Sequence, residues 1–210
     1  AAARERGEPA LLCLRGEPGI GKSALLQALV DERQRGGAVV LSGRCHTAEA
    51  VPFRALDPVI DALTGALLEV PPEALPGLLP ADPRARVRLF PVLGRLSGLD
   101  GAAAWGRGDD DHAGALRRAS DGLRGLLARL AARTPVLLAI DDLHWGDDDS
   151  IALLGALLAG PSPPPLGVVF TACAADPGGA RLLAALTEEH RLGVEVVDVG
   201  PLSCGDAVAA

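Results

Sequence analysis

Aromatic side chains are scarce in this chain of 210 residues, where Phe, Trp and Tyr together make up 2%. Apolar residues nevertheless reach 49%, so the core has to be built from Leu, Val, Ala and Ile on regular helices and strands. Few aromatic rings leave few surfaces on which nucleobases could stack, and a net charge of -7 offers no basic footprint for a nucleic-acid backbone. Composition therefore argues against direct nucleic-acid binding, and the length fits one α/β domain.

Long apolar runs, closely spaced cysteines and an initiator methionine are also absent from the sequence. The longest apolar run, Ile151–Ala159, stops at Gly160, short of the about 18 residues that a membrane-spanning helix needs, so we expect no membrane segment. Without methionine, the chain is expected to be a piece of a longer polypeptide with neighbouring segments on both sides. No two cysteines form a CxxC pair, which favours buried, reduced thiols in the cytoplasm over disulfides or a metal site for Cys13, Cys45, Cys173 and Cys204.

Short apolar runs alternate with segments of helical periodicity along most of the chain. The apolar runs predict strands at Ala10–Arg15, Ala38–Leu41, Val136–Ile140, Leu166–Thr171 and Val194–Val199. The periodic segments between them predict helices at Ser23–Arg33, Asp149–Leu158 and Gly179–His190. Strands that are joined through helices pair in parallel with right-handed crossovers, so the pattern predicts an α/β fold with a parallel sheet.

A helical insertion is expected at about 52–133, where strand signals stop. One apolar face is formed by Leu56, Val59, Ile60, Leu63 and Leu67, and another by Leu116, Ala119, Leu123, Leu126, Leu127 and Leu130. Between these helices, a glycine-rich stretch contains the acidic run Asp109–Asp111. We interpret this run as a solvated loop rather than a metal site, because adjacent carboxylates on a loop have no fixed geometry.

A phosphate-binding loop is the most specific motif, because residues 16–23 match G-x-x-x-x-G-K-[ST] in full between a predicted strand and a predicted helix. Its glycines allow backbone N–H groups to surround phosphate oxygens at a helix N-terminus. Lys22, the only lysine of the chain, would bind the β and γ phosphates and act in catalysis, and the Ser23 hydroxyl would bind Mg²⁺. The predicted nucleotide-binding residues are Gly16, Glu17, Pro18, Gly19, Ile20, Gly21, Lys22, Ser23 and Ala24.

A pair of aspartates follows another apolar strand and predicts the second half of the site. Asp141 would hold Mg²⁺ directly or through water, and Asp142 would orient or deprotonate the attacking water as the second catalytic residue. The alternative is that both aspartates only cap the turn after the strand. Together with the phosphate loop, they predict a site for ATP and Mg²⁺.

These two motifs resemble the STAND-type AAA ATPase modules of large bacterial regulators, including modules attached to LuxR-type DNA-binding domains, nucleotide cyclases and serine/threonine kinases. The likeness rests on residues 16–23, on Ile-Asp-Asp-Leu-His-Trp-Gly-Asp at 140–147, and on the segments 43–45, 51–56 and 89–93. It implies a P-loop NTPase fold, a three-layer α/β/α sandwich with a five-stranded parallel sheet of order 5-1-4-3-2. The predicted strand Leu166–Thr171 would then lie between the phosphate-loop strand and the acidic strand.

The sequence also departs from that family. The position where the family usually has a phosphate-sensing arginine holds Ala174, which leaves the rate of hydrolysis open. We expect a single core at 1–210 without the adenine-binding lead-in and the C-terminal lid that family members generally have. For His144 and Trp145 two interpretations stay open: His144 near the nucleotide, or both residues packing the loop after the acidic strand.

Two functions from different classes fit these residues. The first is a regulatory ATPase module whose ATP and ADP states act on covalently attached sensor and output domains. Its partners would include a second copy of the module, through self-association that depends on the nucleotide. The second is a scaffold that holds nucleotide without significant hydrolysis and presents its helical insertion to proteins. A DNA-remodelling motor shares the core, but the acidic charge and the lack of an identifiable arginine finger argue against it.

Overall fold

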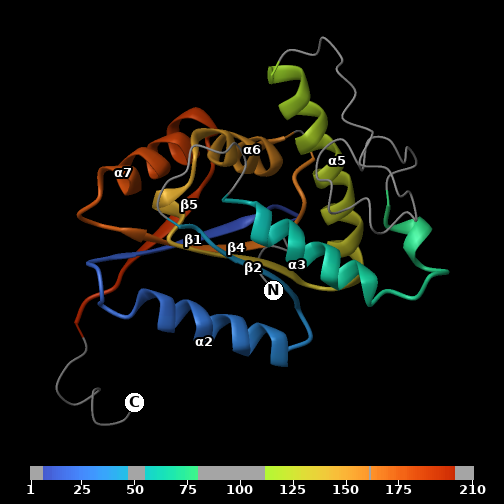
Figure 1. Ribbon diagram of the computed structural model, residues 1–210, viewed down its shortest axis with the longest axis horizontal. Helices are drawn as coiled ribbons and strands as arrows, with labels where there is room; N and C mark the ends of the chain where they lie inside the picture. The colour runs from blue at the N-terminus through green and yellow to red at the C-terminus, as the bar shows by residue number, and fades with distance from the viewer. Residues whose placement is uncertain (1–6, 47–54, 80–111, 161, 202–210) are drawn as a thin grey trace.

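The computed structural model describes residues 7–46, 55–79, 112–160 and 162–201, with 112–119 described as backbone only, and its centre is a parallel sheet (Figure 1). The strands are β1 (Ala10–Gly16), β2 (Val39–Arg44), β3 (Val136–Asp141), β4 (Gly167–Cys173) and β5 (Val194–Asp198). They lie in the order β2-β3-β4-β1-β5, and every neighbouring pair is parallel. This confirms the predicted five-stranded order 5-1-4-3-2, with β4 between the phosphate-loop strand and the acidic strand.

Burial along the strands follows their position in the sheet. The inner strands β3 and β4 are buried at nearly every residue, which requires the continuous apolar runs that their sequences contain. The edge strand β5 is exposed at four of its five residues and includes Glu195 and Asp198. Charged side chains on an edge strand oppose the addition of a strand from another chain, and Glu195 and Asp198 have this effect on β5.

Helices cover both faces of the sheet and form the predicted α/β/α sandwich. Figure 1 shows α2 (Lys22–Arg35) on one face and the other helices on the opposite face. These are α3 (Asp57–Leu68), α5 (His112–Arg133), α6 (Asp148–Ala159) and α7 (Pro177–Ala184). Short turns complete the described elements: 3-10 turns η1 (Leu75–Gly77) and η3 (Leu143–Trp145), and the π-helical turn η4 (Ala185–Glu189).

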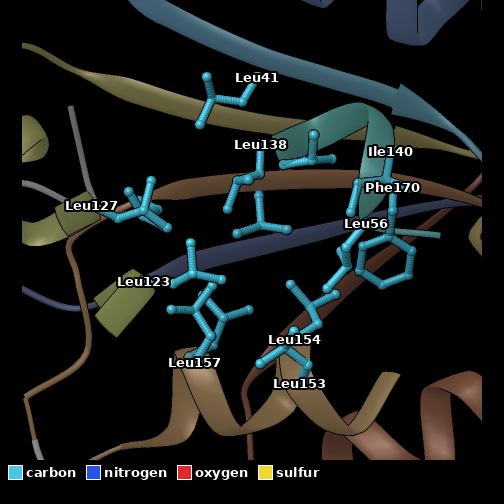
Figure 2. Close-up of a cluster of buried hydrophobic side chains, with 14 of the residues drawn as sticks. Leu41, Leu56, Leu123, Leu127, Leu138, Ile140, Leu153, Leu154, Leu157 and Phe170 are labelled. Carbon is cyan, nitrogen blue, oxygen red and sulfur yellow. The ribbon is translucent and has the colours of Figure 1, made fainter. Parts of the chain in front are cut away.

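Two apolar clusters fill the space between the layers. The smaller one lies under α2 and consists of Leu14, Leu26, Val30, Ala139 and Val169. In the larger one, Figure 2 shows leucines of α5 and α6 facing side chains of the sheet, among them Phe170. The two predicted helix faces are confirmed where side chains are described, since these residues are buried: Leu56, Val59, Ile60, Leu63, Leu67, Leu123, Leu126, Leu127 and Leu130. The side chains of Leu116 and Ala119 lie outside the described residues.

Element boundaries differ from the prediction mainly at two places. Strand β2 continues three residues beyond its predicted end at Leu41, because residues 42–44 pair with 139–141 of β3. The last helix begins at Pro177, where Asp176 caps it, and changes to the π-helical turn at Ala185 instead of running regularly to His190.

Several further predictions concern individual side chains. The cysteines at 13, 45 and 173 are free and buried, as predicted, whereas Cys204 lies outside the described residues. The acidic run at 109–111 also lies outside them. No helix in the described part of the chain is both long enough and apolar enough to span a membrane.

Candidate functional site

The phosphate loop connects β1 to α2 at the carboxyl edge of the sheet. Gly19 and Gly21 have positive φ angles of 77° and 102°, which side chains other than glycine rarely tolerate. Gly16 has a different requirement, because a Cβ placed there would lie 2.7 Å from the carbonyl oxygen of Val199. The three motif glycines are therefore needed for the shape of the backbone, and not only for access of a ligand.

The N-terminus of α2 differs from those of α6 and α7. Asp147 and Asp176 cap the latter two helices by accepting hydrogen bonds from the backbone N–H groups of Ser150 and Gly178. Helix α2 begins after Gly21, which has no side chain to cap it, and its first turn contains no acidic residue. Its first N–H groups, together with the helix dipole, thus favour an external anion.

Lys22 is held across the loop that precedes it. Its side chain is buried with 7% of its surface exposed, and Nζ donates hydrogen bonds to the carbonyl oxygens of Gly16 at 3.0 Å and Glu17 at 2.8 Å. A buried ammonium group is stable only with such partners, so the loop and the lysine stabilise one another. Two of the three donors of the ammonium group are engaged in these bonds, which leaves one further donor.

The two predicted motifs meet although they lie far apart in the sequence. Ser23 Oγ donates a hydrogen bond to Asp141 Oδ1 at 3.0 Å across 118 positions of sequence. The same carboxylate oxygen accepts a bond of 2.7 Å from Thr171 Oγ1, which in turn accepts one from the backbone N–H of Asp142 at 2.7 Å. Asp141 thus joins the start of α2 to the ends of β3 and β4.

Asp142 is fixed by its backbone and by an ion pair. It has φ 56° and ψ 36°, the left-handed conformation that Asp tolerates better than most residues. Its Oδ2 lies 2.9 Å from Arg44 Nη2, while Arg44 Nε lies 3.6 Å from Asp141 Oδ2. Arg44 and Thr171 were not predicted as site residues. The signal that could have found them is their place near the carboxyl ends of parallel strands next to β3.

The loop after β3 contains His144 and Trp145 in the turn η3. His144 has 6% of its surface exposed, and within the described residues its Nδ1 has no hydrogen-bond partner. Burial lowers the pKa of His144, and the positive charge of Lys22 adds to this, although nearby Asp142, Asp176 and Asp141 act in the opposite direction. Trp145 is 43% exposed and contacts the His144 ring, so the packing interpretation fits His144 better than Trp145.

Ala174 lies next to the phosphate loop. Its backbone N–H donates to the carbonyl oxygen of Gly16 at 3.2 Å, and its methyl group is exposed. This position therefore adjoins the phosphate loop, but alanine supplies no charge there.

The donor set fits Mg²⁺ accompanied by a polyphosphate. Within the described ranges, no group of three or more His, Cys, Asp or Glu side chains could hold a metal by itself. Asp141 and Ser23 supply two adjacent oxygen atoms, and Mg²⁺ is commonly bound by one or two protein oxygens together with phosphates and water.

The sheet order, the phosphate loop and the adjoining acidic strand define a P-loop NTPase. More specifically, the chain belongs to the AAA ATPase domain family, whose sequence profile matches residues 1–170, and this membership implies nucleotide binding.

Solved and curated proteins add little to this assignment. A chain from the structure of Drosophila ORC bound to AT-rich DNA and Cdc6 is similar, with 15% sequence identity and a TM-score of 0.45. The match covers 98% of this chain and 54% of that chain, so the present chain spans about half of its length. No curated protein matches the sequence significantly.

Proposed function

We propose that residues 1–210, a single module with a helical insertion at about 52–133, bind ATP with Mg²⁺ and hydrolyse it slowly as a nucleotide-dependent switch. The observation that supports this most is the hydrogen bond between Ser23 and Asp141, which joins the phosphate loop to the acidic strand. In this proposal, the switch acts in the cytoplasm on attached sensor and output domains, and on self-association, as in bacterial STAND-type regulators. The segment itself binds neither membrane nor nucleic acid.

Each site residue has a distinct proposed role. The backbone N–H groups of residues 16–24, apart from Pro18, which has none, hold the phosphates, and Lys22 neutralises the β and γ phosphates. Ser23 and Asp141 would hold Mg²⁺, which supplies charge neutralisation of the phosphates when bound. Asp142 orients the attacking water or accepts its proton at a carboxylate oxygen.

A physical connection from the site to the helices supports the switch. The loop that follows Asp142 is tied to α7, because Arg181 donates to the carbonyl oxygen of Gly146 at 3.2 Å and pairs with Asp148. The same loop contacts the segment before α3 through Asp147, which lies 3.4 Å from the backbone nitrogen of Ala55. A change in the position of Asp142 would therefore act on α7, on α6 through Asp148, and on the segment before α3.

The experiment is a titration with mant-ATP and Mg²⁺ that compares the wild type with Lys22→Ala. We expect at least about tenfold weaker binding by the variant, because a charge-assisted hydrogen bond to phosphate is lost. Arg35→Ala is the matched control, since it removes an exposed cation at the opposite end of α2. Equal binding by the wild type and Lys22→Ala would contradict the proposed site.

A non-hydrolysing scaffold is the second candidate, and the exposed Ala174 beside Gly16 favours it. Release of inorganic phosphate from Mg²⁺-ATP separates the two functions. The switch proposal expects slow turnover that Asp142→Asn abolishes while nucleotide binding remains. Binding without any turnover in the wild type would favour the scaffold.

A further inference from the structure

Arg44 ends the strand β2, beside the acidic pair and away from the phosphate loop. Its register partner in β3 is Asp141, and the sheet order puts β3 and β4 between β2 and β1. With strands about 4.8 Å apart, the end of β3 lies about 10 Å and the end of β2 about 14 Å from the end of β1. A polyphosphate that extends from the loop toward Asp141 therefore directs its last phosphate group, rather than its first, toward Arg44.

The ion pair of Arg44 is suited to a change of partner. The Arg44 side chain is 58% exposed and that of Asp142 is 21% exposed, and exposed ion pairs contribute little to stability. A guanidinium group presents its donors as a planar fork that matches phosphate oxygens as well as carboxylate oxygens. Lys22, by contrast, is buried on two loop carbonyl groups and has little freedom to move.

Charge balance indicates what Arg44 adds. Lys22 and Arg44 offset the charges of Asp141 and Asp142, whereas Ala174 and Ala175 after β4 supply no charge. Without Arg44, Lys22 and the Mg²⁺ that Ser23 and Asp141 would hold are left to offset two carboxylates and a terminal phosphate. A nucleoside diphosphate does not extend as far, so it avoids most of this repulsion.

From this placement we propose that Arg44 reads the terminal phosphate: on binding of a nucleoside triphosphate, its guanidinium exchanges the carboxylate of Asp142 for that phosphate. The inference rests on the proposed nucleotide binding and adds a residue that distinguishes triphosphate from diphosphate. The exchange also releases Asp142, so the carboxylate that acts on water becomes free when the triphosphate is in place.

The test compares the affinities of mant-AMPPNP and mant-ADP, both with Mg²⁺, so that hydrolysis does not interfere. Arg44→Gln should weaken AMPPNP binding by about tenfold and ADP binding by less than about twofold, as expected when one charge-assisted hydrogen bond to the last phosphate is lost. Arg44→Lys should recover part of the AMPPNP affinity because it keeps the charge. Arg35→Gln, an exposed arginine on α2, should change neither affinity.

A double-mutant cycle tests the exchange of partners itself. Asp142→Asn should tighten AMPPNP binding more in the protein that has Arg44 than in the Arg44→Gln variant. Only in the protein with Arg44 does the substitution release an arginine from the carboxylate. The inference would be overturned if Arg44→Gln weakened the binding of both nucleotides equally. It would also be overturned if Arg44→Gln bound AMPPNP more tightly than the wild type, because Arg44 would then compete with Mg²⁺. A wild type that binds neither nucleotide would instead refute the proposed function, and unchanged melting temperatures exclude loss of fold as the cause.

Discussion

His144 shows how one buried side chain makes stability depend on pH. Because burial lowers its pKa below the ordinary value near 6.5, the folded protein binds fewer protons than the unfolded chain between the two pKa values. In that window, unfolding takes up a proton. The contribution of His144 to stability is thus fully present above about pH 6.5 and is lost as the pH falls through its folded-state pKa.

We therefore predict that the free energy of unfolding falls more steeply from pH 7.5 to pH 5.5 in the wild type than in His144→Gln. Urea titrations at the two pH values measure it. The carboxylates are common to both proteins, so their titration cancels in the comparison. A steeper fall in His144→Gln would show that the imidazole gains rather than loses proton affinity on folding.

The sequence predicts single residues of the site best where a motif fixes their spacing. Lys22 and Ser23 follow from the glycine loop, and Asp141 from an acidic group at a strand end. Arg44 and Thr171 could not be assigned in this way. Their contacts depend on the register of β2 and β4 against β3 and on side-chain rotamers, which no local pattern encodes.

At the scale of elements, Asp147 joins the start of α6 to the rest of the loop. Its carboxylate accepts from the Ser150 N–H at 2.8 Å and from the Ser150 hydroxyl at 2.6 Å. Ser150 Oγ is also 3.2 Å from the backbone nitrogen of Ala55, so the cap reaches the segment before α3.

Asp147→Ala should lower the free energy of unfolding by about 1–2 kcal/mol, because the first turn of α6 loses its N-cap. Asp147→Asn is the matched variant, since asparagine caps helices about as well as aspartate. Chemical denaturation of the three proteins measures the difference. If Asn destabilised the protein as much as Ala, the charge of Asp147 rather than its cap would be responsible.

The elements themselves were predictable to different degrees. Each strand and helix predicted from apolar periodicity exists, while the sheet order came from the likeness to a known family rather than from the pattern. The end of β2 was missed because Ser42 and Gly43 carry no apolar signal, although they pair with β3. The π-helical turn at Ala185–Glu189 was missed because its sequence has ordinary helical periodicity.

For the whole molecule, we predict that nucleotide binding and folding are linked. At a ligand concentration about 100 times the dissociation constant, binding to the folded state adds about 2.7 kcal/mol to stability. For a chain of this size, that raises the melting temperature by about 5–10 °C. Differential scanning fluorimetry with Mg²⁺-ATP should show this rise in the wild type and a much smaller one in Lys22→Ala. Equal rises in both would mean that the ligand binds elsewhere.

The central claim is that the backbone N–H groups of residues 16–24, apart from Pro18, which has none, hold the phosphates opposite Asp141. Amide chemical shifts of the ¹⁵N-labelled chain during a titration with Mg²⁺-AMPPNP test it most directly. We predict saturable changes that are largest at Gly19, Gly21 and Lys22 and that extend to Asp141 and Asp142. Unchanged shifts throughout 16–24, with saturable changes elsewhere in the chain, would contradict the claim.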